Sequence, residues 1–249
     1  MIARILTGIS STLLPLALMA QAPGKFPPDS LVNTQVIPHN TPVIQVVGMM
    51  RNFAGDLGVR CQFCHVGEEG MPLERFDFAK DQKRTKLVPR QMMWMVAEIN
   101  RRVDTLPDRP TPGVRVTCRT CHHGVSRPVP LQNVVMDAAA TGEADSAIRA
   151  YRALRAKYYG RDAYDFGEPS LNIAAFRLAR ANRFPEALAL LGLNEEFFPG
   201  SSGMYVFRGN VLLLRGDTTG AAAAYREAVQ RDSTNAEARG RLRDIDRRP

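Results

Sequence analysis

Residues 61–65 (CQFCH) and 118–122 (CRTCH) share one pattern, two cysteines separated by two residues and followed directly by a histidine. Together they contain all four cysteines and two of the four histidines of the 249-residue chain. On one turn of helix the two cysteines and the histidine share a face. Two thiols placed in this way can bond the vinyl groups of a porphyrin while the imidazole binds its iron. The pattern therefore predicts two covalently attached haem c groups, held by the thioethers of Cys61, Cys64, Cys118 and Cys121.

Other sites built from paired cysteines explain the sequence less well. A thioredoxin-like redox pair is expected after a buried strand, which the residues before each motif do not resemble. A single structural zinc bound by all four cysteines gives no reason for a histidine after each pair. Two disulfides leave the histidines equally unexplained. A zinc-binding secreted interaction protein nevertheless stays as an alternative.

The N-terminus is typical of an exported protein. Arg4 precedes an apolar run of about 15 residues and then small residues around Ala20, so residues 1–20 are predicted to be a signal peptide. The run is short for a membrane span. An uncleaved segment that keeps the protein at the membrane is the alternative. The expected location is the periplasm.

Composition and charge agree with a globular protein. Hydrophobic residues make up 45% of the chain, and the formal net charge is +8. Residues 21–136 carry 15 basic and 10 acidic side chains, whereas residues 137–249 carry 17 and 15. The excess of positive charge thus falls mainly where haem propionates would offset it, and an acidic partner surface is the second explanation. No motif suggests a nucleic-acid partner.

Apolar spacing predicts two amphipathic helices, each ahead of one motif. Residues 43–58 place Val46, Met50 and Phe53 on one face and end at Gly58. Residues 89–104 repeat the pattern, with Pro89 expected to begin the helix. Residues 66–88 are expected to be a polar loop. The unit of helix, linker and motif therefore occurs twice.

Residues 137–249 read as a series of helices with a 34-residue period. Equivalent positions carry similar side chains in each repeat, as at Ala175 and Gly209 or Ala187 and Ala221. The pattern resembles two tetratricopeptide (TPR) repeats at 168–201 and 202–235. A preceding helix near 143–158 and a capping helix near 236–247 complete the expected solenoid. A plain helical bundle is the alternative.

The proximal iron ligands are expected to be His65 and His122. For the distal positions the candidate side chains are methionines or the remaining histidines: Met49, Met50, Met71, Met92, Met93, Met95, Met136, His39 and His123. A methionine ligand raises the potential of a haem and a second histidine lowers it. The residues alone leave His/Met and bis-His ligation both open.

Residues 90–100 (RQMMWMVAEIN) and 116–124 (VTCRTCHHG) resemble the tetrahaem cytochrome subunit of photosynthetic reaction centres, as do residues 50–61. The resemblance covers about residues 35–130. It implies that Met50 caps the haem of His65 and that Met92 caps the haem of His122. Because this chain has two motifs instead of four and a repeat-like tail, a role in photosynthesis does not follow.

The expected protein is mainly α-helical. It has a dihaem cytochrome c domain at 21–136 and a TPR-like domain at 137–249. We expect an electron carrier without a catalytic residue, which exchanges electrons with redox partner proteins, a membrane-bound electron-transfer complex among them. The tail would dock a protein partner. A dihaem peroxidase-like enzyme is the alternative, and it requires one open or displaceable iron position.

Overall fold

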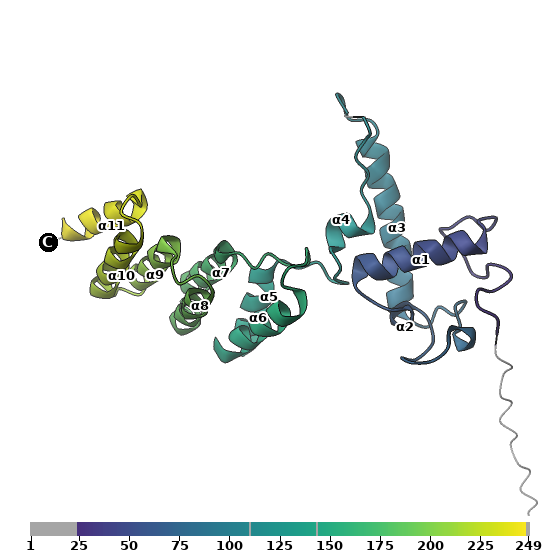
Figure 1. The fold of residues 1–249 in the computed structure, drawn as a ribbon, viewed down its shortest axis with the longest axis horizontal. Helices are drawn as coiled ribbons and strands as arrows, with labels where there is room; N and C mark the ends of the chain where they lie inside the picture. Colours follow the sequence, from purple (N-terminus) through teal and green to yellow (C-terminus); the bar gives the residue numbers. More distant parts are fainter. Residues whose placement is uncertain (1–23, 110, 143, 248–249) are drawn as a thin grey trace, which may run out of the picture. The chain divides into compact units, whose positions relative to one another are not determined.

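A computed structural model describes residues 24–109, 111–142 and 144–247 (Figure 1). The predicted signal peptide lies outside these residues. The fold is mainly helical, as expected, and the described residues form eleven α-helices and a short 3-10 helix, Leu73–Arg75. Their only β-type pairing is an isolated bridge between Val66 and Asp77. None of the helices in the described part of the chain has the length and apolarity to span a membrane.

Two long helices precede the two motifs. α1 spans Val43–Leu57 and ends where Gly58 takes a positive φ of 63°, which confirms the predicted end. α3 spans Arg84–Val103 and therefore begins five residues before Pro89. The prediction that Pro89 starts this helix was wrong.

Tertiary contacts explain why α3 continues on the N-terminal side of Pro89. The Lys86 ammonium donates to the carbonyl oxygens of Phe78, Ala79 and Lys80 at 2.8–2.9 Å. Arg90 forms a two-pronged ion pair with Asp81 at 2.8 and 3.0 Å. These bonds fasten the first turns of α3 to the preceding loop. They offset the backbone hydrogen bond that a proline inside a helix removes.

Contacts divide the described chain into two compact units. One contains the residues up to Met50 together with Arg60–Met95, and the other contains Arg51–Val59 together with the residues from Val96 onward. Each long helix therefore contributes its first part to one unit and its last part to the other. The boundary expected at residue 136 stays a prediction.

The second unit contains seven successive helices after the second motif. Their bounds are Leu131–Thr141 (α5), Ala144–Tyr158 (α6), Glu168–Arg180 (α7), Phe184–Phe197 (α8), Ser202–Leu214 (α9), Thr218–Arg231 (α10) and Ala236–Asp246 (α11). α5 packs on α6, α7 on α8, and α9 on α10, and each pair also contacts the next (Figure 1). α5 begins before residue 137, and its Leu131 and Val135 lie in the core of this helical array.

The 34-residue period predicted the helix boundaries of this array correctly. α7, α9 and α11 begin at Glu168, Ser202 and Ala236, which are the expected starts of the two repeats and of the last helix. Side-chain caps fix several of these ends. Ser201 accepts from the Met204 amide at 2.8 Å, and Asn235 accepts from the Ala238 amide at 2.9 Å.

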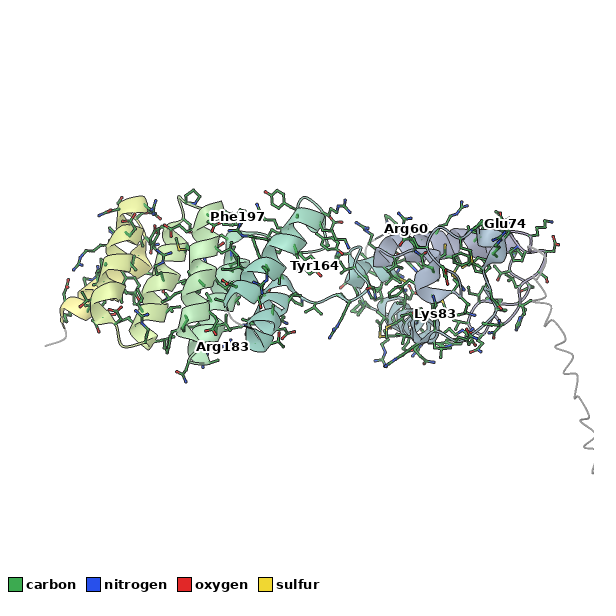
Figure 2. The ribbon with its side chains drawn as sticks, turned by 90° about the horizontal axis from the view of Figure 1, so that it is seen from below. Arg60, Glu74, Lys83, Tyr164, Arg183 and Phe197 are labelled. Carbon is green, nitrogen blue, oxygen red and sulfur yellow. The ribbon has the colours of Figure 1, made fainter. Side chains whose placement is uncertain are left out.

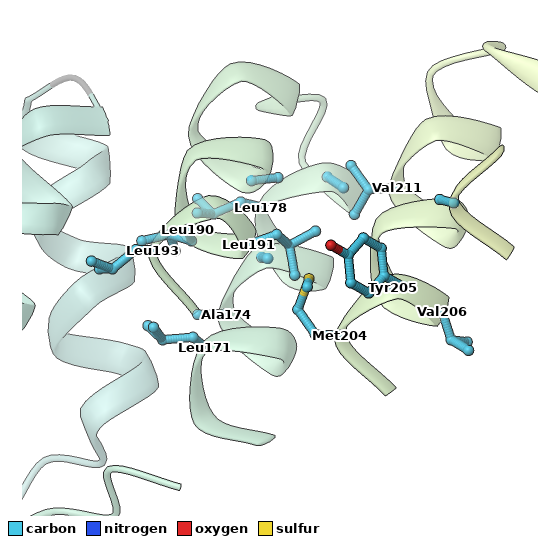
Figure 3. Close-up of a cluster of buried hydrophobic side chains, with 14 of the residues drawn as sticks. Leu171, Ala174, Leu178, Leu190, Leu191, Leu193, Met204, Tyr205, Val206 and Val211 are labelled. Atoms are coloured by element: carbon cyan, nitrogen blue, oxygen red, sulfur yellow. The ribbon is translucent and has the colours of Figure 1, made fainter. Parts of the chain in front are cut away.

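The hydrophobic core belongs almost entirely to the helical array. Its members include Leu171, Leu191 and Met204, which are fully buried (Figure 3). Among the described residues before Leu131, only Val46 and Val125 are buried apolar side chains. The same stretch leaves these large apolar side chains exposed: Val32, Ile44, Met49, Phe63, Leu87, Val88, Met92, Trp94, Met95, Leu106 and Val114. The region around the motifs thus has apolar surface without a protein core to cover it.

Candidate functional site

The first motif forms a single helical turn, α2, at Cys61–Cys64. Both cysteines are free thiols, Cys61 exposed and Cys64 half-buried. Lys83 donates to the carbonyl of Gln62, and the Thr85 hydroxyl donates to the carbonyl of Phe63. Residues at the start of α3 therefore satisfy carbonyl groups that this short helix leaves without intrahelical partners.

His65 follows α2 directly and lies half-buried against the edge of Phe78, with ring centroids 4.9 Å apart. Burial lowers the pKa of the His65 imidazole, and the nearby Lys86 charge lowers it further. The Phe78 carbonyl acts in the opposite direction, but no acceptor reaches hydrogen-bond geometry with the buried Nδ1. A lowered pKa favours the neutral ring, which is the form that binds a metal.

The second motif forms α4, Cys118–His122, and has a better-defined histidine. The His122 Nδ1 lies 2.9 Å from the Val125 carbonyl oxygen. With Nδ1 as the donor, the lone pair falls on Nε2. Metal-binding histidines are commonly oriented by such a bond, which fixes the tautomer and the ring. At the N-terminal end the Thr117 amide donates to the Thr120 hydroxyl at 3.0 Å.

Two distant segments position the second motif. Asn100 of α3 is almost fully buried and bonds both backbone groups of Val116. Its Nδ2 donates to the Val116 carbonyl and its Oδ1 accepts from the Val116 amide, both at 2.8 Å. After the motif, the Gly124 amide donates to the Asp56 carbonyl at 2.9 Å, at the end of α1. The motif is therefore held on both sides by the helices that precede the two motifs.

The thiols of the two motifs form no disulfide. All four cysteines are free. Burial raises the pKa of Cys64, and burial together with the Asp56 charge raises the pKa of Cys118. Across the described ranges, no three His, Cys, Asp or Glu side chains come together as a metal site.

The predicted distal ligands lie on the two long helices. Met50 is half-buried in α1 and belongs to the same unit as His65. Met92 is 38% exposed in α3 and lies in that unit too, whereas His122 lies in the other. The pairing of each methionine with one histidine stays a prediction. Of the other histidines, His39 is exposed and bonded to the Thr34 hydroxyl at 2.8 Å, and His123 is exposed.

The residues of both motifs fit covalent haem. Each offers two free thiols on one helical turn and a half-buried imidazole at the end of that turn. His122 has one nitrogen bonded and the other available, and the buried Nδ1 of His65 lacks a partner. The apolar side chains exposed around the motifs supply the hydrophobic contact that a porphyrin needs.

Sequence reasoning missed the residues that hold the motifs in place. Asn100 occurs in the quoted resemblance, but nothing near it indicated a bond to Val116. Lys83 and Thr85 lay in a segment expected to be a loop. Their partners are 16 to 22 residues away, so no local pattern identifies them.

Comparison with known proteins agrees with the chemistry of the two motifs. The family model of the photosynthetic reaction centre cytochrome c subunit matches residues 60–158. That range includes both motifs and Met92, begins after Met50, and ends with α6. No curated protein matches the chain in a sequence search. The family match supports a relationship to c-type cytochromes, and with it covalently bound haem c and a haem-based role in electron transfer.

Proposed function

We propose that this chain is a periplasmic dihaem cytochrome c that passes single electrons between redox partner proteins. One observation carries the proposal. Two separate motifs each present two free thiols and an adjacent half-buried histidine, inside a range that matches a cytochrome c family. Haem c supplies one-electron chemistry at iron when it is bound.

The protein's own residues would provide attachment, ligation and exclusion of water. Cys61 and Cys64 would form the thioethers of one group, and Cys118 and Cys121 those of the other. His65 and His122 would bind the two irons. The bond from His122 Nδ1 to the Val125 carbonyl supports this role because it holds the ring in one orientation.

Few apolar side chains are buried around the motifs, and this scarcity supports the binding of two haem groups there. Only Val46 and Val125 are buried apolar residues in the described part of the chain before α5. A stretch of this size needs more buried apolar surface than two valines provide. Two haem groups would cover the exposed apolar side chains of α1 and α3 and act as the missing core.

We assign Met50 and Met92 as the distal ligands. Both lie on a long helix ahead of a motif, and thioether ligation would give both groups relatively high potentials. A carrier needs no open iron position, so this assignment favours electron transfer over the peroxidase-like alternative.

The helical array after α4 would serve as a TPR-like region for docking a protein partner. The 34-residue period, the paired helices and the buried small residues Ala175, Ala187 and Ala221 support this assignment. On this proposal, the dihaem part precedes the array, the signal peptide directs export, and the redox partners belong to an electron-transfer complex. The resemblance does not require that complex to be photosynthetic.

The first test is the haem content of the full chain, expressed with its own signal in a host that matures c-type cytochromes. Intact mass and a pyridine haemochrome spectrum should give two covalent haems per chain. Cys118→Ser with Cys121→Ser should leave one. No covalent haem in the wild-type protein would refute the proposal.

The second test concerns the distal ligands. The oxidised protein should show the thioether-to-iron charge-transfer band at the red edge of the spectrum. Met50→Ala should remove the contribution of one haem and Met92→Ala that of the other. Met49→Ala and Met95→Ala change exposed neighbours on the same helices and are the matched controls. An unchanged band in the Met50 and Met92 variants would exclude both residues as ligands.

A further inference from the structure

A pocket of about 380 Å³ lies beside the second motif in the second unit. Cys121 and His122 of α4 line one side of it. Asp162, Tyr164 and Asp165, from the segment between α6 and α7, line the pocket as well. Figure 2 labels Tyr164 in this segment. The helical array therefore faces the residues that would attach and ligate the second haem.

An ion pair joins the two sides of the pocket. The guanidinium of Arg119, a residue inside the second motif, lies 2.7 Å from a carboxylate oxygen of Asp162. Both side chains are more than half exposed, at 52% and 66%. The pair therefore contributes little to stability. Asp162 nevertheless lines the pocket together with Cys121 and His122, and Arg119 lies in the same short helix as these two residues.

The α6–α7 segment has a fixed shape. The Gly167 amide donates to the Asp165 side chain at 2.8 Å, and the Ser170 hydroxyl donates to the Asp165 carbonyl at 2.8 Å. Tyr164 packs edge-on against Tyr158 and Phe166, with ring centroids 5.3 and 6.1 Å apart. Asp162, Tyr164 and Asp165 therefore line the pocket from a segment with its own hydrogen bonds and aromatic contacts.

We infer that the α6–α7 segment forms one wall of the second haem site and sets the potential of that haem. The inference rests on the proposed function. A group bonded to Cys121 and held by His122 must border the pocket, because both side chains line it. A negative charge there stabilises the oxidised iron and a positive charge stabilises the reduced iron. Asp162 and Asp165 therefore lower the potential of this haem and Arg119 raises it. The helical array then acts on electron transfer directly, besides any docking role.

The test is a spectroelectrochemical titration of the full-length dihaem protein and three variants. Asp162→Asn should raise the midpoint potential of one haem. We take the charge to lie roughly 10 Å from the iron, in a medium with an effective dielectric constant of about 40. Removing one unit charge then changes the ratio of reduced to oxidised haem about fourfold at a fixed potential. Arg119→Gln should shift the same haem in the opposite direction. The double variant should return close to the wild-type value, because it restores the net charge.

A matched control is available within the helical array. Glu196 pairs with Arg152 at 2.7 Å and is similarly exposed, but it does not line the pocket. Glu196→Gln removes one carboxylate and leaves one arginine unpaired, as Asp162→Asn does. Both potentials should stay unchanged in this variant. High salt should reduce the shifts at the pocket, because both partners are exposed.

The outcomes separate this inference from the proposed function. Opposite shifts of one haem in the Asp162 and Arg119 variants support the inference. Unchanged potentials, or equal shifts of both haems, would overturn it while leaving a dihaem electron carrier intact. A protein that carries no covalent haem would instead refute the proposed function.

Discussion

The contact between the end of α1 and the loop after the second motif yields a quantitative prediction. Gly58 has a φ of +63°, and a Cβ added there would lie 2.0 Å from the Gly124 carbonyl oxygen. In Gly58→Ala, the left-handed backbone costs about 1–2 kcal/mol for a residue with a Cβ. The Gly124 loop must also move away, which strains the 2.9 Å bond from its amide to the Asp56 carbonyl. Loss of that bond adds about 1 kcal/mol.

We therefore expect Gly58→Ala to lower the free energy of unfolding by about 2–3 kcal/mol. Urea unfolding of the holoprotein, followed by circular dichroism, measures this change. Hydrogen exchange of the Gly124 amide gives a local readout, and the protection of this amide should fall in the variant. Gly55→Ala is the matched control, because Gly55 lies in the last turn of α1, three residues before Gly58, with nothing near its missing Cβ. It should stabilise the protein by up to about 1 kcal/mol. A Gly58 variant within about 0.5 kcal/mol of wild type, with Gly124 still protected, would refute the reasoning.

Three further predictions follow from single contacts. Gly209→Ala places a Cβ 2.4 Å from the buried ring of Tyr225. The overpacking should lower the free energy of unfolding by about 1–2 kcal/mol, net of the gain in helix propensity. Asn100→Ala leaves both backbone groups of Val116 without partners and should cost about 2–4 kcal/mol in the same unfolding assay. The pKa of Asp81 is held below its ordinary value, chiefly by its hydrogen bond from Arg90. The Asp81 carboxylate therefore stabilises the fold at any pH above its ordinary pKa. This stabilisation is lost as the pH falls through the lower pKa that the group has in the folded protein. In Asp81→Asn, the acid limb of a stability–pH curve should be shallower than in wild type.

Matched variants test the first two of these predictions. Gly192→Ala adds a methyl group inside α8 where nothing lies near it, and it should not destabilise the protein. Asn52→Ala changes an exposed asparagine of α1 and should alter stability by less than about 0.5 kcal/mol. Losses in these controls as large as in the test variants would contradict the assigned contacts. For Asp81→Asn, an acid limb of the stability–pH curve that superimposes on the wild-type limb would contradict the assigned role of the Asp81 carboxylate.

Much of the fold was predictable because the signals were local. α1 ended at the expected glycine, and the 34-residue period gave the starts of α7, α9 and α11. The exception came where side-chain contacts to a neighbouring loop override a local preference. α3 passes through Pro89 because Lys86 and Arg90 bind a loop that the sequence does not mark as a partner.

The residues of the candidate site could be named from the sequence, and their roles stay a prediction. The spacing of Cys61, Cys64 and His65 predicts one site without any structure, because about one helical turn brings these residues together. The role of Asn194 in α8 needed the structure. This buried amide donates to the Glu168 carbonyl at 3.0 Å and to Asn172 at 2.9 Å, a network that no periodicity predicts.

The sequence by itself predicted the chemistry of the two motifs and determined the helical character of this protein, since both depend on residues within a few positions of one another. Only the tertiary structure decided what surrounds the chemistry. It alone placed Asn100 beside Val116, and Asp162 beside Arg119 at a separation of 43 residues in the chain. Such pairs form because the helices pack around shared surfaces, and one buried amide or one exposed carboxylate carries no local signal of its partner.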